Sequence, residues 1–261
     1  MYARTMGKSS RQPLAGCYVI SLRPVGAHTP LRRAAAAFGA RVLALSPWRI
    51  EVQDDATTRR ELRAALGADI VIATSPAAVR AASALQALRR KRGQTWCAVG
   101  AGTAAALRRA GIGEVLSPGR MDSDGLLALA ELRSVRGRDI GLLTAPGGRG
   151  AIAPELQRRG ARVLRADVYR RVEVAPAPAV LARLRRLRAR PWLAASSGEA
   201  LQGTLARLPA ELAETLRAAD VAVASERLAQ LARTLGFRGR VVVAASARPR
   251  DLVAAMAAAI G

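Results

Sequence analysis

The sequence predicts an α/β protein made of two doubly wound parallel sheets, and three observations support this. First, 51% of the 261 residues are hydrophobic but only 3% are aromatic, which suits helices on buried parallel strands. Second, short apolar runs alternate with amphipathic segments along the chain. Third, the whole pattern occurs twice. Alternation of this kind predicts parallel sheets with helices on both faces.

The duplication is clearest in the segment GARVL, which occurs at 39–43 and again at 160–164, an offset of 121 residues. The same offset matches Trp48 with Tyr169. Further along, an apolar run ending in Thr74 and Ser75 matches one ending in Ser196 and Ser197, at an offset of 122. The register therefore persists with small drifts, as loop insertions would produce. Two copies of one unit are expected, with the chemistry in an open cleft between them.

Each copy is predicted to contain strands that alternate with helices. Amphipathic segments such as 104–110 and 228–235 are each followed by a glycine that suits a helix C-cap. The expected strands lie near 18–23, 41–50, 69–74, 95–99 and 114–117 in the first copy, and near 139–144, 162–174, 191–195, 220–224 and 240–245 in the second.

The formal net charge is +23, and arginine supplies nearly all the positive charge because lysine occurs only at Lys8 and Lys91. One interpretation is a polyanionic partner, either nucleic acid or a substrate with many carboxylates or phosphates. The favoured interpretation of the bulk charge is the amino-acid usage of a GC-rich genome. The arginines between 183 and 190 accordingly indicate a solvated helix face.

Cysteine and histidine content excludes several chemistries. Cys17 and Cys97 are far apart, and His28 is the single histidine. A zinc, iron–sulfur or histidine-dependent metal site is therefore not expected, nor is a Ser-His-Asp or Cys-His catalytic arrangement. Residues 1–13 show no secretory signal, and the Ala-rich stretch 252–260 is too short to span a membrane. A cytoplasmic location without membrane association is expected.

Hydroxyl and glycine residues cluster at the predicted strand-to-helix turns. Such turns lie at the carboxyl edge of a parallel sheet, where backbone N–H groups at helix N-termini favour anions. Each residue alone is an ordinary helix cap, but several on one edge favour a binding site. The candidates are Thr74, Ser75, Gly100, Gly102, Thr103, Ser196, Ser197, Gly198 and Ser225.

Two glycine-rich segments invite comparison with nucleotide-binding loops. Residues 100–105 fit the pattern G-x-G-x-x-A, but they follow the fourth expected strand and no acidic residue closes the next one. A nicotinamide or flavin site is therefore disfavoured. The segment 146–150 lacks the ending of a phosphate-binding loop. Arg149 within it is a candidate partner for a substrate carboxylate.

A set of motifs, running in order along nearly the whole chain from about residue 18, resembles the uroporphyrinogen-III synthase family. No single motif is specific, whereas the ordered set is. The motifs are Gly100-x-Gly102-Thr103 leading to Ala110-Gly111-Ile112, then Ser123-Asp124-Gly125-Leu126-Leu127, Gly148-Arg149, Arg159-Gly160-Ala161-Arg162-Val163, Val168-Tyr169-Arg170-Arg171, Ser196-Ser197-Gly198-Glu199-Ala200-Leu201 and Leu235-Gly236-Phe237.

The resemblance implies two flavodoxin-like domains joined by a two-stranded β linker. Domain 1 would comprise 14–46 and 176–261, and domain 2 would comprise 52–167. The linker strands would be 47–51 and 168–175, and residues 1–13 would form a flexible tail. The two copies of the repeat would therefore not coincide with the two domains.

The resemblance also implies a reaction: cyclisation of hydroxymethylbilane to uroporphyrinogen III, with loss of water and inversion of ring D through a spiro intermediate. It implies a polycarboxylate substrate and no cofactor or metal. It is also compatible with a transient contact with the preceding pathway enzyme. Tyr169 matches the family's tyrosine and is the candidate acid, its alternative being a packing role. Thr144-Ala145-Pro146 and Gly150 depart from the family pattern, so the role of the 144–150 loop is open.

Two other classes of function are weighed. A cytosolic two-domain regulator of the periplasmic-receptor type would also close on a small molecule. A nucleic-acid binder is motivated by charge alone, since no recognition motif is present and aromatic residues for base stacking are scarce.

Overall fold

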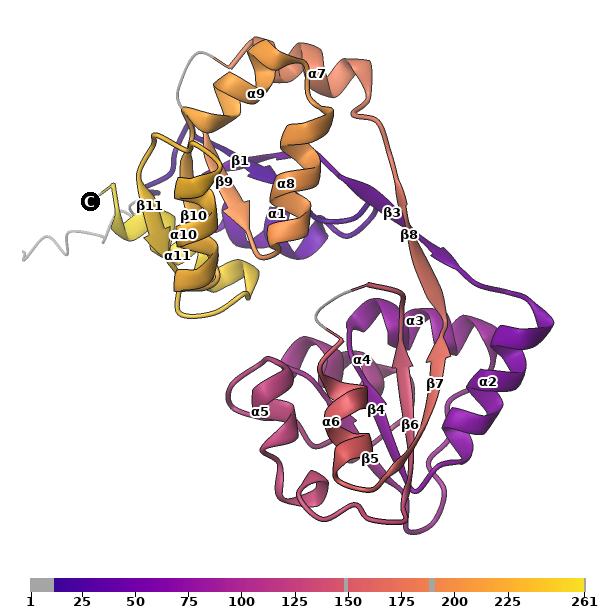
Figure 1. Cartoon of the computed structure of the whole chain (residues 1–261). Helices are drawn as coiled ribbons and strands as arrows, with labels where there is room; N and C mark the ends of the chain where they lie inside the picture. Colours follow the sequence, from indigo (N-terminus) through magenta and orange to yellow (C-terminus); the bar gives the residue numbers. More distant parts are fainter. Residues whose placement is uncertain (1–11, 148–149, 188–190, 261) are drawn as a thin grey trace, which may run out of the picture. The chain divides into compact units, whose positions relative to one another are not determined.

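The computed structural model describes residues 12–147, 150–187 and 191–260, and the chain divides into two units (Figure 1). Unit 1 comprises the chain up to Arg49 and from Glu173 onward, and unit 2 comprises Ile50–Val172. Residues 1–11 of the expected N-terminal tail and the candidate Arg149 lie outside the described residues.

Unit 1 is organised around a parallel sheet with the strand order β2-β1-β9-β10-β11. Strands β1 and β9 are neighbours although they are distant in sequence, and they pair with Val19 opposite Trp192. The sheet thus combines segments from both copies of the repeat. Its strands are β1 (Tyr18–Ser21), β2 (Arg41–Ala44), β9 (Trp192–Ala195), β10 (Asp220–Val223) and β11 (Val241–Val243).

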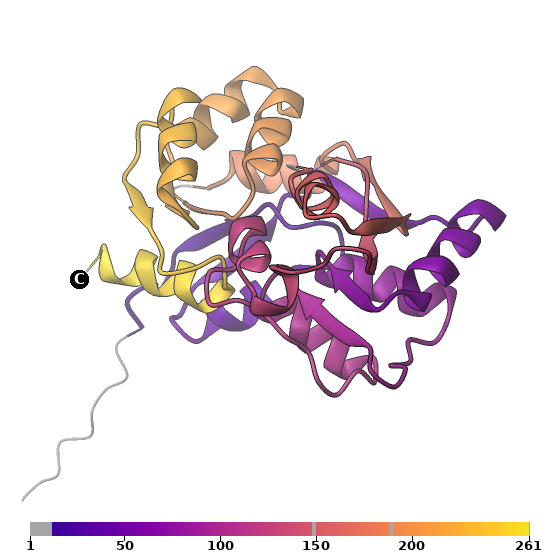
Figure 2. The same ribbon diagram turned by 60° about the horizontal axis from the view of Figure 1, so that its bottom comes forward.

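Helices cover this sheet in two layers. On one face, α1 (Thr29–Ala36) and α11 (Pro249–Ala258) lie side by side (Figures 1 and 2). They bury Leu31 and Met256 in one core with Val19. In the other layer α8 packs on β9 and α10 on β10. The helices of that layer are α7 (Pro178–Arg185), α8 (Gly198–Arg207), α9 (Ala210–Arg217) and α10 (Glu226–Thr234).

Unit 2 contains a second parallel sheet, with the strand order β5-β4-β6-β7. Leu116 extends it by a single bridge to Cys97 at the β5 edge. The strands are β4 (Ile70–Ala73), β5 (Thr95–Ala98), β6 (Asp139–Thr144) and β7 (Arg162–Asp167). Numbered along the chain, unit 1 has the strand order 2-1-3-4-5 of flavodoxin-like folds. Unit 2, with Leu116 as its third strand, has the order 3-2-1-4-5, the other common doubly wound arrangement.

Alternate residues of the unit 2 strands enter two separate cores. Val71 and Ala73 pack with helices α2, α3 and α4, whereas Ile70 and Ile72 pack with α5, η1 and α6. The period of two in a strand produces this division, and it explains why β4 is apolar throughout. The helices are α2 (Ala56–Gly67), α3 (Pro76–Leu85), α4 (Ala101–Arg109), α5 (Ser123–Leu127), α6 (Ile152–Arg158) and the 3₁₀ turn η1 (Ala130–Leu132).

Strands β3 (Trp48–Val52) and β8 (Tyr169–Glu173) form a two-stranded ribbon through which the chain passes twice. Backbone bonds from Gln53 N to Val168 O and from Val174 N to Pro47 O show that the strands are antiparallel. Trp48 therefore lies near one end of the ribbon and Tyr169 near the other.

The predicted fold class is confirmed, since both units are parallel α/β sheets. The prediction of continuous strands over 41–50 and 162–174 is wrong. Pro47 lacks the N–H that would extend β2. At Val168 the chain changes partners, because its N–H donates to Thr144 O in the sheet while its carbonyl accepts from Gln53 in the ribbon. The strand expected at 114–117 is reduced to the bridge at Leu116.

Candidate active site

A pocket of about 190 Å³ lies at the carboxyl ends of β4 and β6 in unit 2, where the chain enters β8. Free helix N-termini and strand ends make this edge the usual ligand site of parallel α/β sheets. The lining includes the start of α6 and seven polar side chains. They are Thr74, Ser75, Ser123, Thr144, Arg165, Tyr169 and Arg171.

Tyr169 combines a buried ring with a hydroxyl at this pocket. The residue is only 4% exposed and belongs to the core formed by α2, α3 and α4. The change of strand partner at Val168 fixes the backbone just before it. Its Oη lies 3.2 Å from Ser75 Oγ, so the phenol is held at both its ring and its hydroxyl.

Ser75 lies in the turn after β4 and is the N-cap residue of α3. Its extended backbone (φ −157°, ψ 158°) and Pro76 in the first turn of the helix suit a helix start. Ser75 Oγ accepts a hydrogen bond from Ala78 N at 3.0 Å, and the same atom contacts the Tyr169 hydroxyl. The cap predicted from the sequence is therefore present, and the serine also contacts the candidate acid.

Thr74 and Thr144 form a second pair of hydroxyls in the pocket. Thr74 Oγ1 lies 3.1 Å from Thr144 Oγ1 and donates to Leu143 O at 3.2 Å. Thr74 follows β4 and Thr144 is the last residue of β6, and these two strands pair in parallel. Thr144, where the chain departs from the family pattern, is thus part of the pocket wall.

Two arginines line the pocket. Arg165 of β7 donates to Asp167 at 3.0 Å and to Ala145 O at 3.1 Å, so its guanidinium holds the start of the 145–150 loop. Arg171 lies two residues after Tyr169 on β8 and lines the same pocket. Sequence reasoning missed Ser123, Thr144, Arg165 and Arg171 as site residues. The period of two along β8 could have identified Arg171, because residues two apart share a strand face.

The glycine turn before α4 lies outside the lining of this pocket. A Cβ on Gly100 would come within 3.1 Å of Met121 Cβ, and one on Gly102 would lie 3.8 Å from Pro76 Cγ. Thr103 is buried in α4, at 4% exposure. The turn therefore neighbours the start of α3, while its threonine side chain is directed into the unit.

The remaining candidates are in unit 1 and form a second group. Ser197 caps α8, with its Oγ accepting from Ala200 N at 3.3 Å, and Ser196 beside it is exposed. Ser225 occupies the N-cap position of α10. A Cβ on Gly198 would approach Leu231 Cδ2 to 2.7 Å, so this glycine permits α8 to start close to α10.

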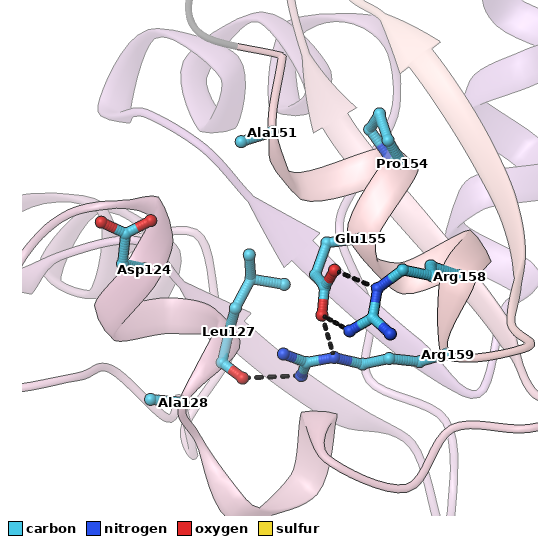
Figure 3. A pocket seen from close by; sticks show the side chains of 8 residues that line it. All are labelled: Asp124, Leu127, Ala128, Ala151, Pro154, Glu155, Arg158 and Arg159. Carbon is cyan, nitrogen blue, oxygen red and sulfur yellow. Dashed lines mark hydrogen bonds and ion pairs between the residues drawn. The ribbon is translucent and has the colours of Figure 1, made fainter.

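A larger hollow, of about 560 Å³, lies between α5 and α6 (Figure 3). Three of its charged side chains pair with one another: Glu155 accepts hydrogen bonds from Arg158 and Arg159 at 2.7–2.8 Å. These bonds lower the pKa of the Glu155 carboxyl to about 2. Arg159 also donates to Leu127 O and Leu132 O, both at 2.7 Å. The groups here tie α6 to α5 and serve structure.

His28 in unit 1 is held by two serines. Its Nδ1 lies 2.8 Å from Ser21 Oγ and its Nε2 lies 2.8 Å from Ser46 Oγ. Burial, reinforced by Arg32 and Arg23, lowers the pKa of this imidazole. Because Ser21 ends β1 and Ser46 follows β2, the histidine fastens two strand ends of unit 1 together.

The described part of the chain contains neither a cluster of metal ligands nor a membrane-spanning helix. There, no group of three or more His, Cys, Asp or Glu side chains could hold a metal ion. The helices within it are all too short or too polar to cross a membrane.

Comparisons with known proteins agree on one family. The model of the HEM4 family, described as uroporphyrinogen-III synthase HemD, matches residues 29–254. A uroporphyrinogen-III synthase of Escherichia coli is 36% identical over 181 residues, 67% of this chain and 74% of that protein. The corresponding Salmonella typhimurium protein is 33% identical over 178 residues, 65% of this chain and 71% of that one.

Solved structures show the same fold. A mutant uroporphyrinogen III synthase of Thermus thermophilus superposes with a TM-score of 0.61 at 22% identity, covering 94% of this chain and 98% of that one. The Helicobacter pylori uroporphyrinogen-III synthetase superposes with a TM-score of 0.59 at 12% identity, covering 94% and 100%.

Two parallel α/β units, each drawing strands from both halves of the chain, and a polar pocket at a sheet's carboxyl edge define an enzyme that acts on a small molecule. The family match covers most of the sequence. The chain belongs to the uroporphyrinogen-III synthase family, and so is a cyclising hydro-lyase of tetrapyrrole biosynthesis.

Proposed function

We propose that the chain cyclises hydroxymethylbilane to uroporphyrinogen III, with loss of water and inversion of ring D through a spiro intermediate. The observation that carries this is the buried Tyr169, whose hydroxyl reaches a pocket lined by hydroxyls and guanidinium groups. Such a pocket suits a substrate that must lose a hydroxyl and that carries carboxylates.

Tyr169 is proposed as the general acid. Its Oη would give a proton to the hydroxymethyl oxygen as the carbon–oxygen bond breaks, so that the oxygen leaves as water. The resulting azafulvene is attacked by the substituted carbon of ring D, which forms the spiro intermediate. The reaction consumes no cofactor. Most of the rate gain would come from holding the tetrapyrrole folded, so that this closure outpaces the spontaneous one.

Substrate carboxylates are proposed to bind at the helix N-termini and hydroxyls of the strand ends. Charge-assisted bonds to backbone N–H groups and to guanidinium are the strong ones for such ligands. Arg171, which lies two residues after the acid and lines the pocket, is added as a cationic candidate. The proposed binding residues are Thr74, Ser75, Gly100, Gly102, Thr103, Arg149, Ser196, Ser197, Gly198 and Ser225, with Ser123 and Thr144 from the pocket wall.

A cytoplasmic location is proposed alongside this function. Cys17 and Cys97 are free thiols, which a reducing compartment preserves. Because the substrate also closes spontaneously, a transient contact with the preceding pathway enzyme would shorten its exposure to solvent. Cell fractionation, and cross-linking with that enzyme during turnover, would test these two statements.

Fresh hydroxymethylbilane supplied to the purified protein tests the function. After oxidation, chromatography separates the porphyrin isomers, and isomer III is expected in excess of that formed without protein. Isomer I alone, in an amount independent of the protein, would contradict the proposal. Saturable binding of the bilane without isomer III would instead favour a regulator that binds the small molecule.

A further inference from the structure

Ser75 has two hydrogen-bonding partners, and together they constrain the direction of the bond to Tyr169. Its Oγ accepts from Ala78 N at 3.0 Å and lies 3.2 Å from Tyr169 Oη, where either hydroxyl could donate. Only one proton can lie between the two oxygens. If Tyr169 directs its own proton to the substrate, the proton between them must come from Ser75.

We propose that Ser75 is a positioning residue that donates its hydroxyl proton to Tyr169 Oη and stabilises the phenolate formed when the tyrosine acts as an acid. This inference rests on the proposed function. The transfer is balanced: the Tyr169 proton moves to the leaving oxygen, the carbon–oxygen bond breaks towards that oxygen, and the negative charge stays on Oη. After the spiro intermediate reopens and the unsubstituted α-carbon of ring D closes the macrocycle, the proton lost from that carbon restores the phenol.

Two features of the described residues favour this arrangement. The bond from Ser75 becomes charge-assisted when the phenolate forms, and such bonds are about twice as strong as neutral ones. Ser75 also stands at the N-terminus of α3, a ten-residue helix whose partial positive charge favours a nearby anion. The Ala78 N–H occupies one acceptor position of Ser75 Oγ, and the hydroxyl proton remains free to point towards Tyr169.

A second helix cap in unit 2 supplies a matched control. Asp55 caps α2, with its Oδ1 accepting from Thr58 N at 2.9 Å. It is neither part of the pocket lining nor among the proposed binding residues. The Asp55→Ala variant therefore loses a helix cap without losing a bond to the candidate acid.

The experiment measures kcat and KM for uroporphyrinogen III formation, and the thermal midpoint, in Ser75→Ala, Ser75→Thr, Asp55→Ala and Tyr169→Phe. Both alanine variants should lose thermal midpoint, because each loses one cap and Ser75→Ala also loses the bond to Tyr169. Ser75→Ala should lower kcat about tenfold more than Asp55→Ala, and its change in KM should be smaller than its change in kcat. Ser75→Thr, which keeps the hydroxyl, should restore kcat to within about threefold of the original.

A double variant decides between coupling and an independent structural role. Adding Ser75→Ala to Tyr169→Phe should lower kcat by less than twofold further, because the serine acts through the phenol. The inference would be overturned if the two kcat losses multiply in the double variant, or if Ser75→Ala and Asp55→Ala have equal kcat. A wild-type protein that forms no isomer III would contradict the proposed function itself, which is a separately observed result.

Discussion

Replacing Tyr169 by phenylalanine removes one oxygen from a ring that otherwise stays in place. The ring is 4% exposed and packed in the core of unit 2, so no cavity of side-chain size is created. The hydrogen bond lost is the contact of 3.2 Å with Ser75, whose Oγ keeps its bond from Ala78 N. A neutral hydrogen bond of this kind contributes about 1 kcal/mol to the free energy of unfolding, or roughly 4 °C to the thermal midpoint of unit 2.

The loss in activity should be much larger than the loss in stability. A positioned acid contributes roughly 10²- to 10⁴-fold, and we expect about 10- to 100-fold because the hydroxymethyl pyrrole is already reactive. Stopped assays of isomer III against isomer I give kcat, and Tyr18→Phe serves as the control. Tyr18 begins β1 at the amino edge of the unit 1 sheet, where it contacts Arg183. A Tyr169→Phe enzyme with kcat within twofold of the original would return the tyrosine to a packing role.

Three further variants test other parts of the structure. Arg171→Gln should raise KM about tenfold at low salt and much less at high salt, whereas Arg170→Gln, which removes an exposed ion pair with Glu51, should leave KM unchanged; equal effects would contradict a carboxylate contact. Gly141→Ala should destabilise unit 2 by about 3 kcal/mol in urea unfolding, because its Cβ would lie 1.9 Å from Ala65 O, while Gly113→Ala, with open space around it, should be nearly neutral. Because the folded pKa of His28 is lowered from 6.5, its contribution is present above that pH and is lost as the pH falls below it. The urea midpoint should therefore fall between pH 7.5 and 5.5, and the part of that fall due to His28 should vanish in His28→Asn.

Much of the fold was predictable because it depends on local patterns. The sequence of each segment shows the period-two burial of strands and the alternation of strand and helix. The N-caps at Ser75 and Ser197 follow from residue type. The breaks between β2 and β3 and between β7 and β8 were harder. Pro47 is visible in the sequence, but Val168 is an ordinary strand residue whose change of partner depends on two other segments.

The site was predictable only in part. Thr74, Ser75 and Tyr169 follow from their positions at strand ends, whereas the role of Tyr169 as an acid entered through the family resemblance. No motif around Arg165 marks it as a site residue. Its guanidinium reaches the pocket because it donates a hydrogen bond across the sheet to Ala145 O. Contacts of this kind depend on the strand register, which here places Leu142 opposite Arg165. The sequence pattern does not determine that register.

The duplication explains why the repeat alone does not predict the contact between Ser75 and Tyr169. Periodicity matches Ser75 with Ser197 and Tyr169 with Trp48, each across the two copies. The hydrogen bond instead joins Ser75 of the first copy to Tyr169 of the second. They meet because unit 2 takes β4 and β5 from the first copy and β6 and β7 from the second. Two tandem domains, each folded from one copy, would keep both capping serines and would separate this serine from this phenol. The exchange of strands between copies is therefore what creates the contact on which the proposed acid chemistry depends.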